Sequence, residues 1–298
     1  MPGFVKSEDL VRDYLKVGTT FLFEGHTYTI LMSGKPKKNS GQGGEPKTDI
    51  YVLTKDENGK EREFKISYKK ENADFLENKM SAERAEQIFG ANWEKRIMAY
   101  TMSVKKHFED RKVIYKESGN HTEKGAMTLG WKFEFVDKTG GELSGDAKLS
   151  VDEKIEVYSG RKLADRLKDA KVNGKVIKNS GVADYVIKKE GMKSAQEIID
   201  NILLVEDYIV KHPDVYFVCK ALNYRTIKQK YDGDRPLSVQ VGWMINDGLL
   251  SAEIEFDQPL KKNGKAQKDR LLACLKTLSV KNTDDINSGN ADMKKVNK

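Results

Sequence analysis

Cysteine and histidine are scarce in this chain of 298 residues, which has two cysteines, Cys219 and Cys274, and four histidines. The cysteines lie far apart in apolar runs and outside any CxxC spacing, which excludes a disulfide framework and a cysteine-based zinc site. No Walker or dinucleotide glycine motif and no Ser-His-Asp elbow is present. No apolar run is long enough to span a bilayer, and the charged residues 1–18 argue against a secretory signal. We therefore expect a cytoplasmic protein without membrane contact.

Charged residues are abundant instead, at 33% of the chain against 38% hydrophobic residues, which is typical of a soluble globular protein. The formal net charge of +7 favours a polyanionic partner, although a solvated lysine-rich surface gives the same total. The length allows one large α/β domain or two smaller ones. We expect one domain over residues 1–280, followed by a disordered tail over 281–298, which is polar and lacks periodicity.

The segment 43–70 predicts a β-hairpin. Residues 48–54 are mostly β-branched, aromatic or aliphatic and favour a strand that begins at Asp49. The sequence Asp-Glu-Asn-Gly at 56–59 is a turn, and 63–69 alternates apolar and polar residues, as a returning strand does. One face of this hairpin is expected to pack, and the other is polar.

The turn decides which residues face Asp49. A three-residue loop with a left-handed glycine places Asp49 opposite Ser67 and diagonal to Lys69, whereas a two-residue turn opposes Asp49 to Tyr68. We favour the three-residue loop because a one-residue slip would separate the apolar residues of the two strands. These are Ile50, Val52, Phe64, Ile66 and Tyr68.

An Asp beside a Lys on neighbouring strands suits phosphodiester hydrolysis, since a carboxylate holds a hard divalent cation and an ammonium group orients the attacking water. Pro46-Lys47-Thr48-Asp49 followed by Ser67-Tyr68-Lys69 resembles the bipartite signature of the PD-(D/E)xK nucleases. The block GGEPKTD at 43–49 is similar to one found in small type II restriction endonucleases that cut CG-containing four-base sites. The resemblance covers about thirty residues and is carried by this hairpin alone.

The resemblance implies an α/β fold with a restriction-endonuclease-like core of αβββαβ order, in which helices flank a mixed central sheet. It also implies Mg²⁺ as cofactor, with Asp49 as a metal ligand and Lys69 serving the nucleophilic water. Ser67 stands where the family usually has a second acid. Glu45 or Glu63 could supply the missing carboxylate, and Glu45 is favoured because Pro46 would hold it near Asp49.

Glu8 is a further acidic candidate, because a helix expected at 7–18 precedes the sheet. It would be either an outer acid of the site or a solvated residue at a helix N-terminus, and we favour the solvated residue.

Basic and polar side chains outside the hairpin are candidates for DNA contact. The glycine-rich loop 34–44 either lies along phosphates or is a disordered surface loop, and its position directly before Asp49 favours contact. Recognition elements are expected within 105–235, where turns at 118–122 and 223–231 offer residues that read base edges, although any hairpin has polar tips. The candidate DNA-binding residues are Lys35, Lys37, Lys38, Lys47, Asn120, His121, Arg225 and Lys228.

The remaining pattern predicts a series of helices and strands. Further helices are expected at 75–89, 91–107, 161–171, 194–209 and around Leu271. Strands are expected as hairpins over 19–33 and 237–256, at 112–116, 127–136 and 215–222, and near Ile155.

We therefore interpret the chain as a metal-dependent endonuclease that cuts double-stranded DNA, of the sequence-specific type II restriction kind, and a homodimer is compatible with this activity. Two alternatives stay open: a structure-selective or repair nuclease of the same fold, and a noncatalytic DNA-binding module that keeps the hairpin.

Overall fold

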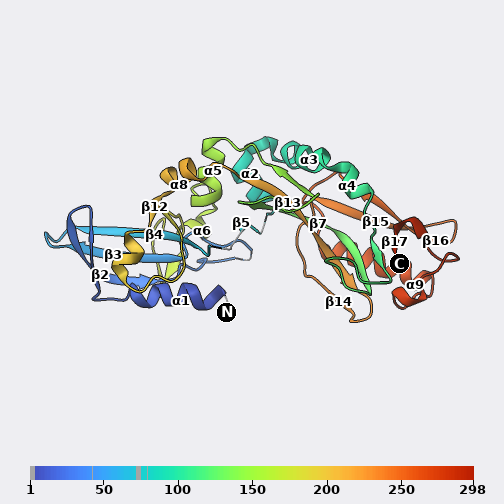
Figure 1. Cartoon of the computed structure of the whole chain (residues 1–298), viewed down its shortest axis with the longest axis horizontal. Helices are drawn as coiled ribbons and strands as arrows, with labels where there is room; N and C mark the ends of the chain where they lie inside the picture. Colours follow the sequence, from blue (N-terminus) through green and yellow to red (C-terminus); the bar gives the residue numbers. More distant parts are fainter. Residues whose placement is uncertain (1–3, 42, 72–74, 79) are drawn as a thin grey trace. The chain divides into compact units, whose positions relative to one another are not determined.

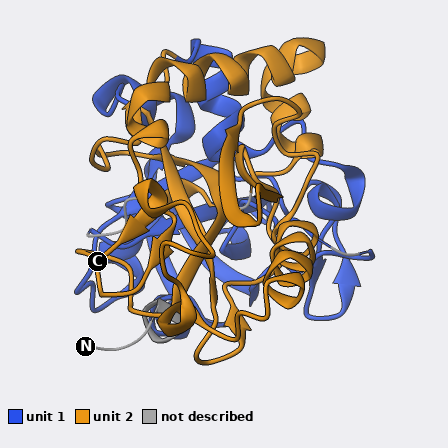
Figure 2. Cartoon of the chain, turned by 90° about the vertical axis from the view of Figure 1, so that its right-hand side faces the viewer, with its two compact units in different colours: residues 1–74, 149–214 blue, residues 75–148, 215–298 orange. Residues whose placement is uncertain are grey.

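The computed structural model describes residues 4–41, 43–71, 75–78 and 80–298, and the side chains of residues 4–7 lie outside this description. Where one domain was expected, the chain forms two compact units (Figure 2). Unit 1 comprises residues 1–74 and 149–214, and unit 2 comprises residues 75–148 and 215–298. Each unit therefore contains two separate stretches of chain.

Unit 1 is a sheet with helices on both faces. Its elements are α1 (Phe4–Tyr14), β1 (Thr20–Phe23), β2 (His26–Gly34), β3 (Ile50–Asp56), β4 (Glu61–Lys69), α5 (Val151–Ser159), α6 (Asp165–Lys168), β9 (Lys171–Val172), β10 (Lys175–Val176), β11 (Tyr185–Lys188), α7 (Ala195–Ile199), β12 (Leu203–Leu204) and α8 (Val205–Lys211). The main sheet has the order β1-β2-β3-β4-β11-β12. Strand β11 runs parallel to β4 and the other neighbours are antiparallel, so the sheet is mixed.

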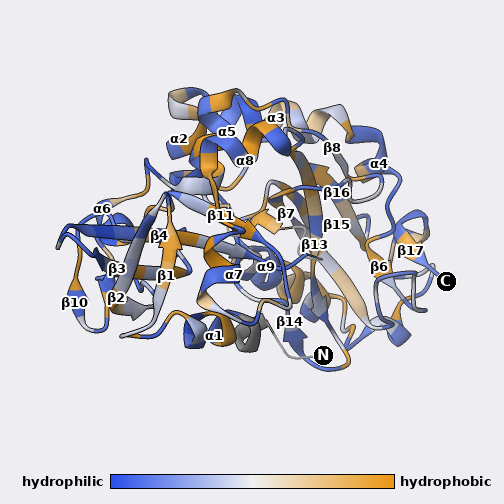
Figure 3. Ribbon diagram, turned by 60° about the vertical axis from the view of Figure 1, so that its left-hand side comes forward, coloured by the Kyte–Doolittle hydropathy of each residue, from blue (hydrophilic) through white to orange (hydrophobic). Residues whose placement is uncertain are grey.

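The two faces of this sheet bury different helices. Figure 1 shows α1 on one side of the sheet and α5 and α8 on the other. Helix α1 carries both apolar and polar residues (Figure 3). Its Val11, together with Leu15 directly after the helix, joins α7 in a core with the apolar face of the strands. The apolar residues Ile50, Val52, Phe64, Ile66 and Tyr68 all belong to that core, as the sequence predicts.

The β3–β4 hairpin has the predicted register. Ile50 pairs with Ile66 and Val52 with Phe64, which fits a three-residue loop between Asp56 and Lys60. Gly59 closes this loop with a φ of +89°, a left-handed conformation that glycine adopts at little cost. The difference is at the start, because β3 begins at Ile50 rather than Asp49.

The expected strand near Ile155 is wrong, because this segment forms helix α5. It begins with a capping box, in which the Ser150 side chain accepts a hydrogen bond from Glu153 N–H and the Glu153 side chain accepts one from Ser150 N–H. Gly160 ends it in a left-handed conformation. The helix expected at 161–171 is reduced to the short α6, and the helix expected at 194–209 is divided into α7 and α8 around β12.

Helix α1 also differs from the expected bounds, since it begins at Phe4 and ends at Tyr14 rather than spanning 7–18. The expected 19–33 hairpin is confirmed as β1 and β2, which turn at Glu24 and Gly25.

Unit 2 is built on a second sheet. Its elements are β5 (Phe75–Glu77), α2 (Ala82–Phe89), η1 (Gly90–Asn92), α3 (Trp93–Ser103), α4 (Lys105–Glu109), β6 (Ile114–Tyr115), β7 (Ala126–Val136), β8 (Ser144–Asp146), β13 (Tyr216–Arg225), β14 (Lys230–Tyr231), β15 (Val239–Asn246), β16 (Leu249–Glu255), α9 (Gly264–Thr277), η2 (Thr283–Asp285), η3 (Met293–Lys295) and β17 (Val296–Asn297). The main path is β14-β13-β7-β15-β16. Aromatic residues of β7, β13 and α3 pack together in its core, notably Phe133, Phe217 and Tyr100.

Two expectations for this part of the chain change. The helix expected at 75–89 begins only at Ala82, because Phe75–Glu77 forms β5 against β7, and this helix belongs to unit 2. Residues 281–298 are ordered rather than a disordered tail: Ile286 is fully buried, and Val296 pairs in parallel with Ile114. These contacts join residues far apart in the sequence, so local periodicity gives no sign of them.

Candidate active site

The candidate catalytic residues of the hairpin meet at one end of β3 and β4. Asp49 N–H donates to the Ile66 carbonyl at 2.9 Å, which places Asp49 directly before the first residue pair of the two strands. The Asp49 carboxylate accepts a hydrogen bond from Tyr68 N–H at 2.9 Å and a longer one from the Ser67 hydroxyl at 3.4 Å. The sequence predicts this convergence, and the structure places Asp49 and Ser67 in contact.

The electrostatic environment of Asp49 is unfavourable for a charged carboxylate. Burial raises the pKa of Asp49, and the negative charge of Glu8 adds to that effect. The positive charge of Lys69, the Tyr68 N–H and the charge of Lys35 act in the opposite direction, but the pKa remains raised. A partly buried carboxylate near a second carboxylate is a site that a cation would stabilise.

Glu8 is the second carboxylate of this site. It lies on α1, three and seven residues before the core residues Val11 and Leu15, and therefore on the face of the helix that packs against the sheet. Only 7% of Glu8 is exposed, which contradicts the favoured prediction of a solvated helix end. Its position relative to Val11 and Leu15 is the sequence signal that identifies it.

Lys35 pairs with this carboxylate. Its ammonium nitrogen lies 2.5 Å from Glu8 Oε2, and its charge also acts on Asp49. Lys35 directly follows β2, and Gly34 at the end of that strand pairs with Tyr51 of β3. Strand pairing thus brings Lys35 to the same end of the strands as Asp49, where its exposed side chain pairs with Glu8.

The two acids proposed to replace the missing carboxylate differ from Glu8 in their surroundings. Glu45 is exposed, whereas Glu8 is the carboxylate whose charge raises the pKa of Asp49. Glu63 accepts a hydrogen bond from the Tyr51 hydroxyl, and together with burial it raises the pKa of that tyrosine. The structure therefore favours Glu8 as the partner of Asp49.

The donor atoms present fit a hard divalent cation. Glu8 and Asp49 supply carboxylate oxygens and Ser67 a neutral hydroxyl oxygen, and Mg²⁺ is commonly held by one or two carboxylates together with waters and substrate phosphates. Across residues 4–41, 43–71, 75–78 and 80–298, no group of three or more His, Cys, Asp or Glu residues is arranged to hold a metal ion. Oxygen donors of this kind suit a hard cation such as Mg²⁺ better than zinc, which is held mostly by His and Cys.

The other predicted lysines of unit 1 lie on the loop before Asp49. Lys37 and Lys38 are exposed and Lys47 is partly buried. The loop is held to the β9–β10 hairpin at Lys37, which exchanges backbone hydrogen bonds with Lys171 at 2.9 and 2.7 Å. Lys47 N–H in turn donates to the Gly181 carbonyl at 2.8 Å.

The predicted recognition residues belong to unit 2. Asn120 and His121 are exposed in the turn between β6 and β7. Arg225 is held in ion pairs with Glu123 and Asp232, and Lys228 also pairs with Glu123. Arg225 and Lys228 therefore have protein carboxylates as partners, while Asn120 and His121 keep an exposed surface.

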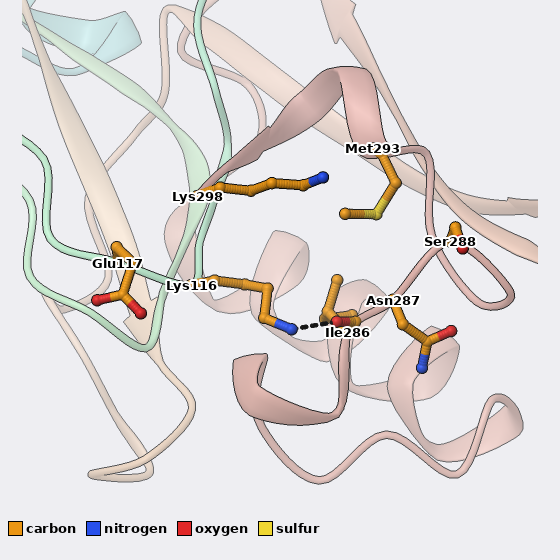
Figure 4. A pocket seen from close by; sticks show the side chains of 7 residues that line it. All are labelled: Lys116, Glu117, Ile286, Asn287, Ser288, Met293 and Lys298. Carbon is orange, nitrogen blue, oxygen red and sulfur yellow. Dashed lines mark hydrogen bonds between the residues drawn. The ribbon is translucent and has the colours of Figure 1, made fainter.

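Unit 2 also contains a cavity of about 370 Å³ that sequence reasoning did not predict (Figure 4). It is lined by Lys116, Glu117, Ile286, Asn287, Ser288, Met293 and Lys298. Figure 4 shows the Lys116 ammonium directed at Ile286, whose carbonyl accepts its hydrogen bond. Lys116 thereby anchors the C-terminal segment of unit 2.

Comparison of the chain with protein-family models, with curated proteins and with solved structures found no match. Among the helices of the described residues, none has the length and apolar character needed to cross a membrane.

Proposed function

We propose that this protein is a metal-dependent nuclease that hydrolyses phosphodiester bonds of double-stranded DNA in the cytoplasm. The observation that carries the proposal is the partly buried Asp49 carboxylate, which accepts hydrogen bonds from Tyr68 N–H and the Ser67 hydroxyl. Burial and the charge of Glu8 raise its pKa, while the charges of Lys69 and Lys35 lower it. Carboxylates with a perturbed pKa cluster at functional sites. Burial of a charge lowers the stability of the fold, so such a residue is usually kept for its function rather than for its packing.

The order of elements in unit 1 supports the same proposal. In chain order, unit 1 contains a helix (α1), three antiparallel strands (β2, β3 and β4), a helix (α5) and a strand parallel to β4 (β11). This subset has the αβββαβ order that the resemblance to the PD-(D/E)xK nucleases implies, and β1, α6 and the β9–β10 hairpin are additional to it. The first stretch of unit 2 is inserted between β4 and α5, so the active residues and the crossover helix are separated in the sequence.

Each residue of the site has a distinct role in this proposal. Asp49 and Glu8 would hold Mg²⁺, which when bound supplies Lewis-acid stabilisation of negative charge on the phosphate. Lys69 would orient the attacking water and stabilise the negative charge that it gains. Ser67 donates a hydrogen bond to Asp49 and so fixes the orientation of that carboxylate.

We further propose that cleavage is sequence-specific, as in type II restriction. Unit 2 is a separate compact unit that contributes none of Glu8, Asp49, Ser67 and Lys69, and it presents exposed Asn120 and His121 in a turn. Asparagine and histidine can contact base edges, and discrimination of bases requires such contacts in addition to phosphate contacts.

One observation favours a second candidate, a DNA-binding module without catalysis. Ser67 cannot supply a negative charge, and Lys35 already neutralises Glu8 at 2.5 Å. Lys35 would therefore compete with a cation for the Glu8 carboxylate.

Incubation of supercoiled plasmid with the protein and Mg²⁺, and in parallel with a chelator, separates the two candidates. Lys69→Gln should abolish Mg²⁺-dependent cleavage, while Lys60→Gln, an exposed lysine near the β3–β4 turn, should not. Tight binding without cleavage by the unaltered protein would reject the nuclease. A digest of long unmodified DNA that yields a smear instead of discrete bands would reject sequence specificity alone.

A further inference from the structure

Residues 161–178 are unusually basic, with seven Lys or Arg residues and two acidic residues, Asp165 and Asp169. They form α6 and the small β9–β10 hairpin of unit 1. Asn173 and Gly174 make its turn with φ values of +48° and +86°, a pair of left-handed residues typical of a tight two-residue hairpin. A short, well-defined hairpin thus carries lysines before and after its turn.

This hairpin is attached to the glycine-rich loop that precedes Asp49. The reciprocal backbone hydrogen bonds between Lys37 and Lys171 join the two segments, and the Asn39 side chain donates to the Asp169 carbonyl at 2.8 Å. At the turn, the Asn173 side chain donates to the Ser33 carbonyl of β2 at 3.0 Å. The loop and the hairpin therefore form one continuous basic surface.

Gly34 shows how close this attachment is. A Cβ atom at Gly34 would lie 2.7 Å from the Asn173 side-chain oxygen and 2.8 Å from Val172. Gly34 pairs with Tyr51 at the beginning of β3. The hairpin therefore packs against the end of the strands where Asp49 lies.

The charges on this surface are not neutralised by carboxylates of the described residues. Five exposed lysines make up what we call the lysine surface: Lys37, Lys38, Lys171, Lys175 and Lys178. In the part of the chain that the structure describes, none of the five forms an ion pair with a carboxylate. By contrast, the neighbouring Lys168 pairs with Asp165 at 3.1 Å, and Arg161 pairs with Glu206.

We propose that the lysine surface binds the phosphate backbone of the DNA and holds the duplex at the end of β3 and β4 where Asp49 lies. This inference rests on the proposed nuclease function and adds to it the place where the backbone lies. Lysines that neutralise phosphates release condensed counterions, so they contribute affinity that is independent of sequence and falls with salt. Unpaired lysines on a fixed hairpin suit this role because protein carboxylates do not compete with the phosphates.

The test is a titration of a fluorescently labelled duplex without divalent metal, followed by anisotropy at several salt concentrations. The variant replaces Lys171, Lys175 and Lys178 with Gln, and should bind at least about tenfold more weakly at low salt. Removal of one lysine–phosphate interaction lowers the slope of log K against log salt by about 0.9, so removal of three lowers it by about 2.7. Between about 50 and 200 mM salt, the affinity of the variant should then fall roughly 40-fold less than that of the unaltered protein.

A matched control removes the same charge elsewhere in unit 1, by changing the exposed residues Lys16, Lys55 and Lys60 to Gln. Lys55 and Lys60 flank the β3–β4 turn, at the other end of the hairpin from Asp49. The control should keep the affinity and the salt slope of the unaltered protein. Equal losses in the two variants would show an effect of net charge alone and would overturn the proposal.

Circular dichroism melts confirm that each variant is folded before its affinity is compared. Failure of the unaltered protein to bind DNA would also overturn the lysine surface. If DNA binds and depends on these lysines but is never cut, the surface stands and the proposed catalysis fails.

Discussion

The exchange Glu8→Gln tests which acid completes the site together with Asp49. The structure favours Glu8, whereas the hairpin motif favours Glu45. Glu8 is 7% exposed and its charge acts on Asp49, whereas Glu45 is exposed and lies next to Pro46 in the motif. Both exchanges remove one negative charge and leave an isosteric side chain. If Glu8 completes the cation site, Glu8→Gln should reduce the cleavage rate strongly and Glu45→Gln should not.

The expected loss follows from the electrostatics of a partly buried pair. Two unit charges about 4 Å apart interact by about 4 kcal/mol at an effective dielectric constant of about 20. The Gln side chain keeps one neutral oxygen donor, so the expected loss is about 2–4 kcal/mol, equivalent to a roughly 30- to 900-fold lower rate.

The assay is the single-turnover cleavage rate of a linear duplex as a function of Mg²⁺ concentration and pH. Because Glu8 raises the pKa of Asp49, Glu8→Gln should also move the acidic limb of the pH–rate profile to lower pH. Glu45→Gln should leave both the rate and that limb in place. A larger loss for Glu45→Gln than for Glu8→Gln would refute the assignment and restore the motif-based choice of acid.

Three further predictions follow from individual contacts. The raised pKa of Asp49 means that the folded state holds this proton more tightly than the unfolded chain does, so the contribution of Asp49 to stability is present at low pH and is lost as pH rises through the raised pKa. Asp49→Asn should therefore melt at a higher temperature than the unaltered protein at neutral pH, and an unchanged or lower melting temperature would contradict the burial of its charge. Lys35→Gln removes the cation paired with Glu8, so a lower Mg²⁺ concentration should give half-maximal cleavage, and a higher one would show that Lys35 assists the site instead. Ile286→Ala should destabilise unit 2 by about 2–5 kcal/mol, because Ile286 is fully buried, whereas Ile227→Ala, at 51% exposure, should cost less than about 1 kcal/mol in the same denaturant titration.

The β3–β4 hairpin was predictable because its determinants are local. The position of Gly59 specifies the three-residue loop, and the alternation of apolar residues on both strands specifies the register. The convergence of Asp49 and Ser67 follows from that register without knowledge of the rest of the fold. The start of helix α5 could also have been predicted, because the sequence has Ser150 and Glu153 at the spacing of a capping box.

Glu8 and the division into units depend on contacts between distant residues. A glutamate near a helix N-terminus is usually solvated, and only the packing of Val11 and Leu15 on the sheet buries Glu8. The insertion of residues 75–148 of unit 2 between β4 and α5 leaves no local signal, because each segment alone has ordinary helix and strand patterns. Order after residue 281 likewise comes from the pairing of Val296 with Ile114, which no local pattern indicates.

The most direct test of the central claim is Mg²⁺-dependent plasmid cleavage by Asp49→Asn, compared with Asp207→Asn, which changes an exposed carboxylate of α8. The partly buried Asp49 carboxylate is proposed to hold the cation, so Asp49→Asn should lose cleavage by at least about a hundredfold, a loss of about 3 kcal/mol. Asp207→Asn should cut like the unaltered protein. Because Asp49→Asn is expected to gain stability, its inactivity cannot be attributed to unfolding. Undiminished, Mg²⁺-dependent cleavage by folded Asp49→Asn would contradict the claim that this site performs the hydrolysis.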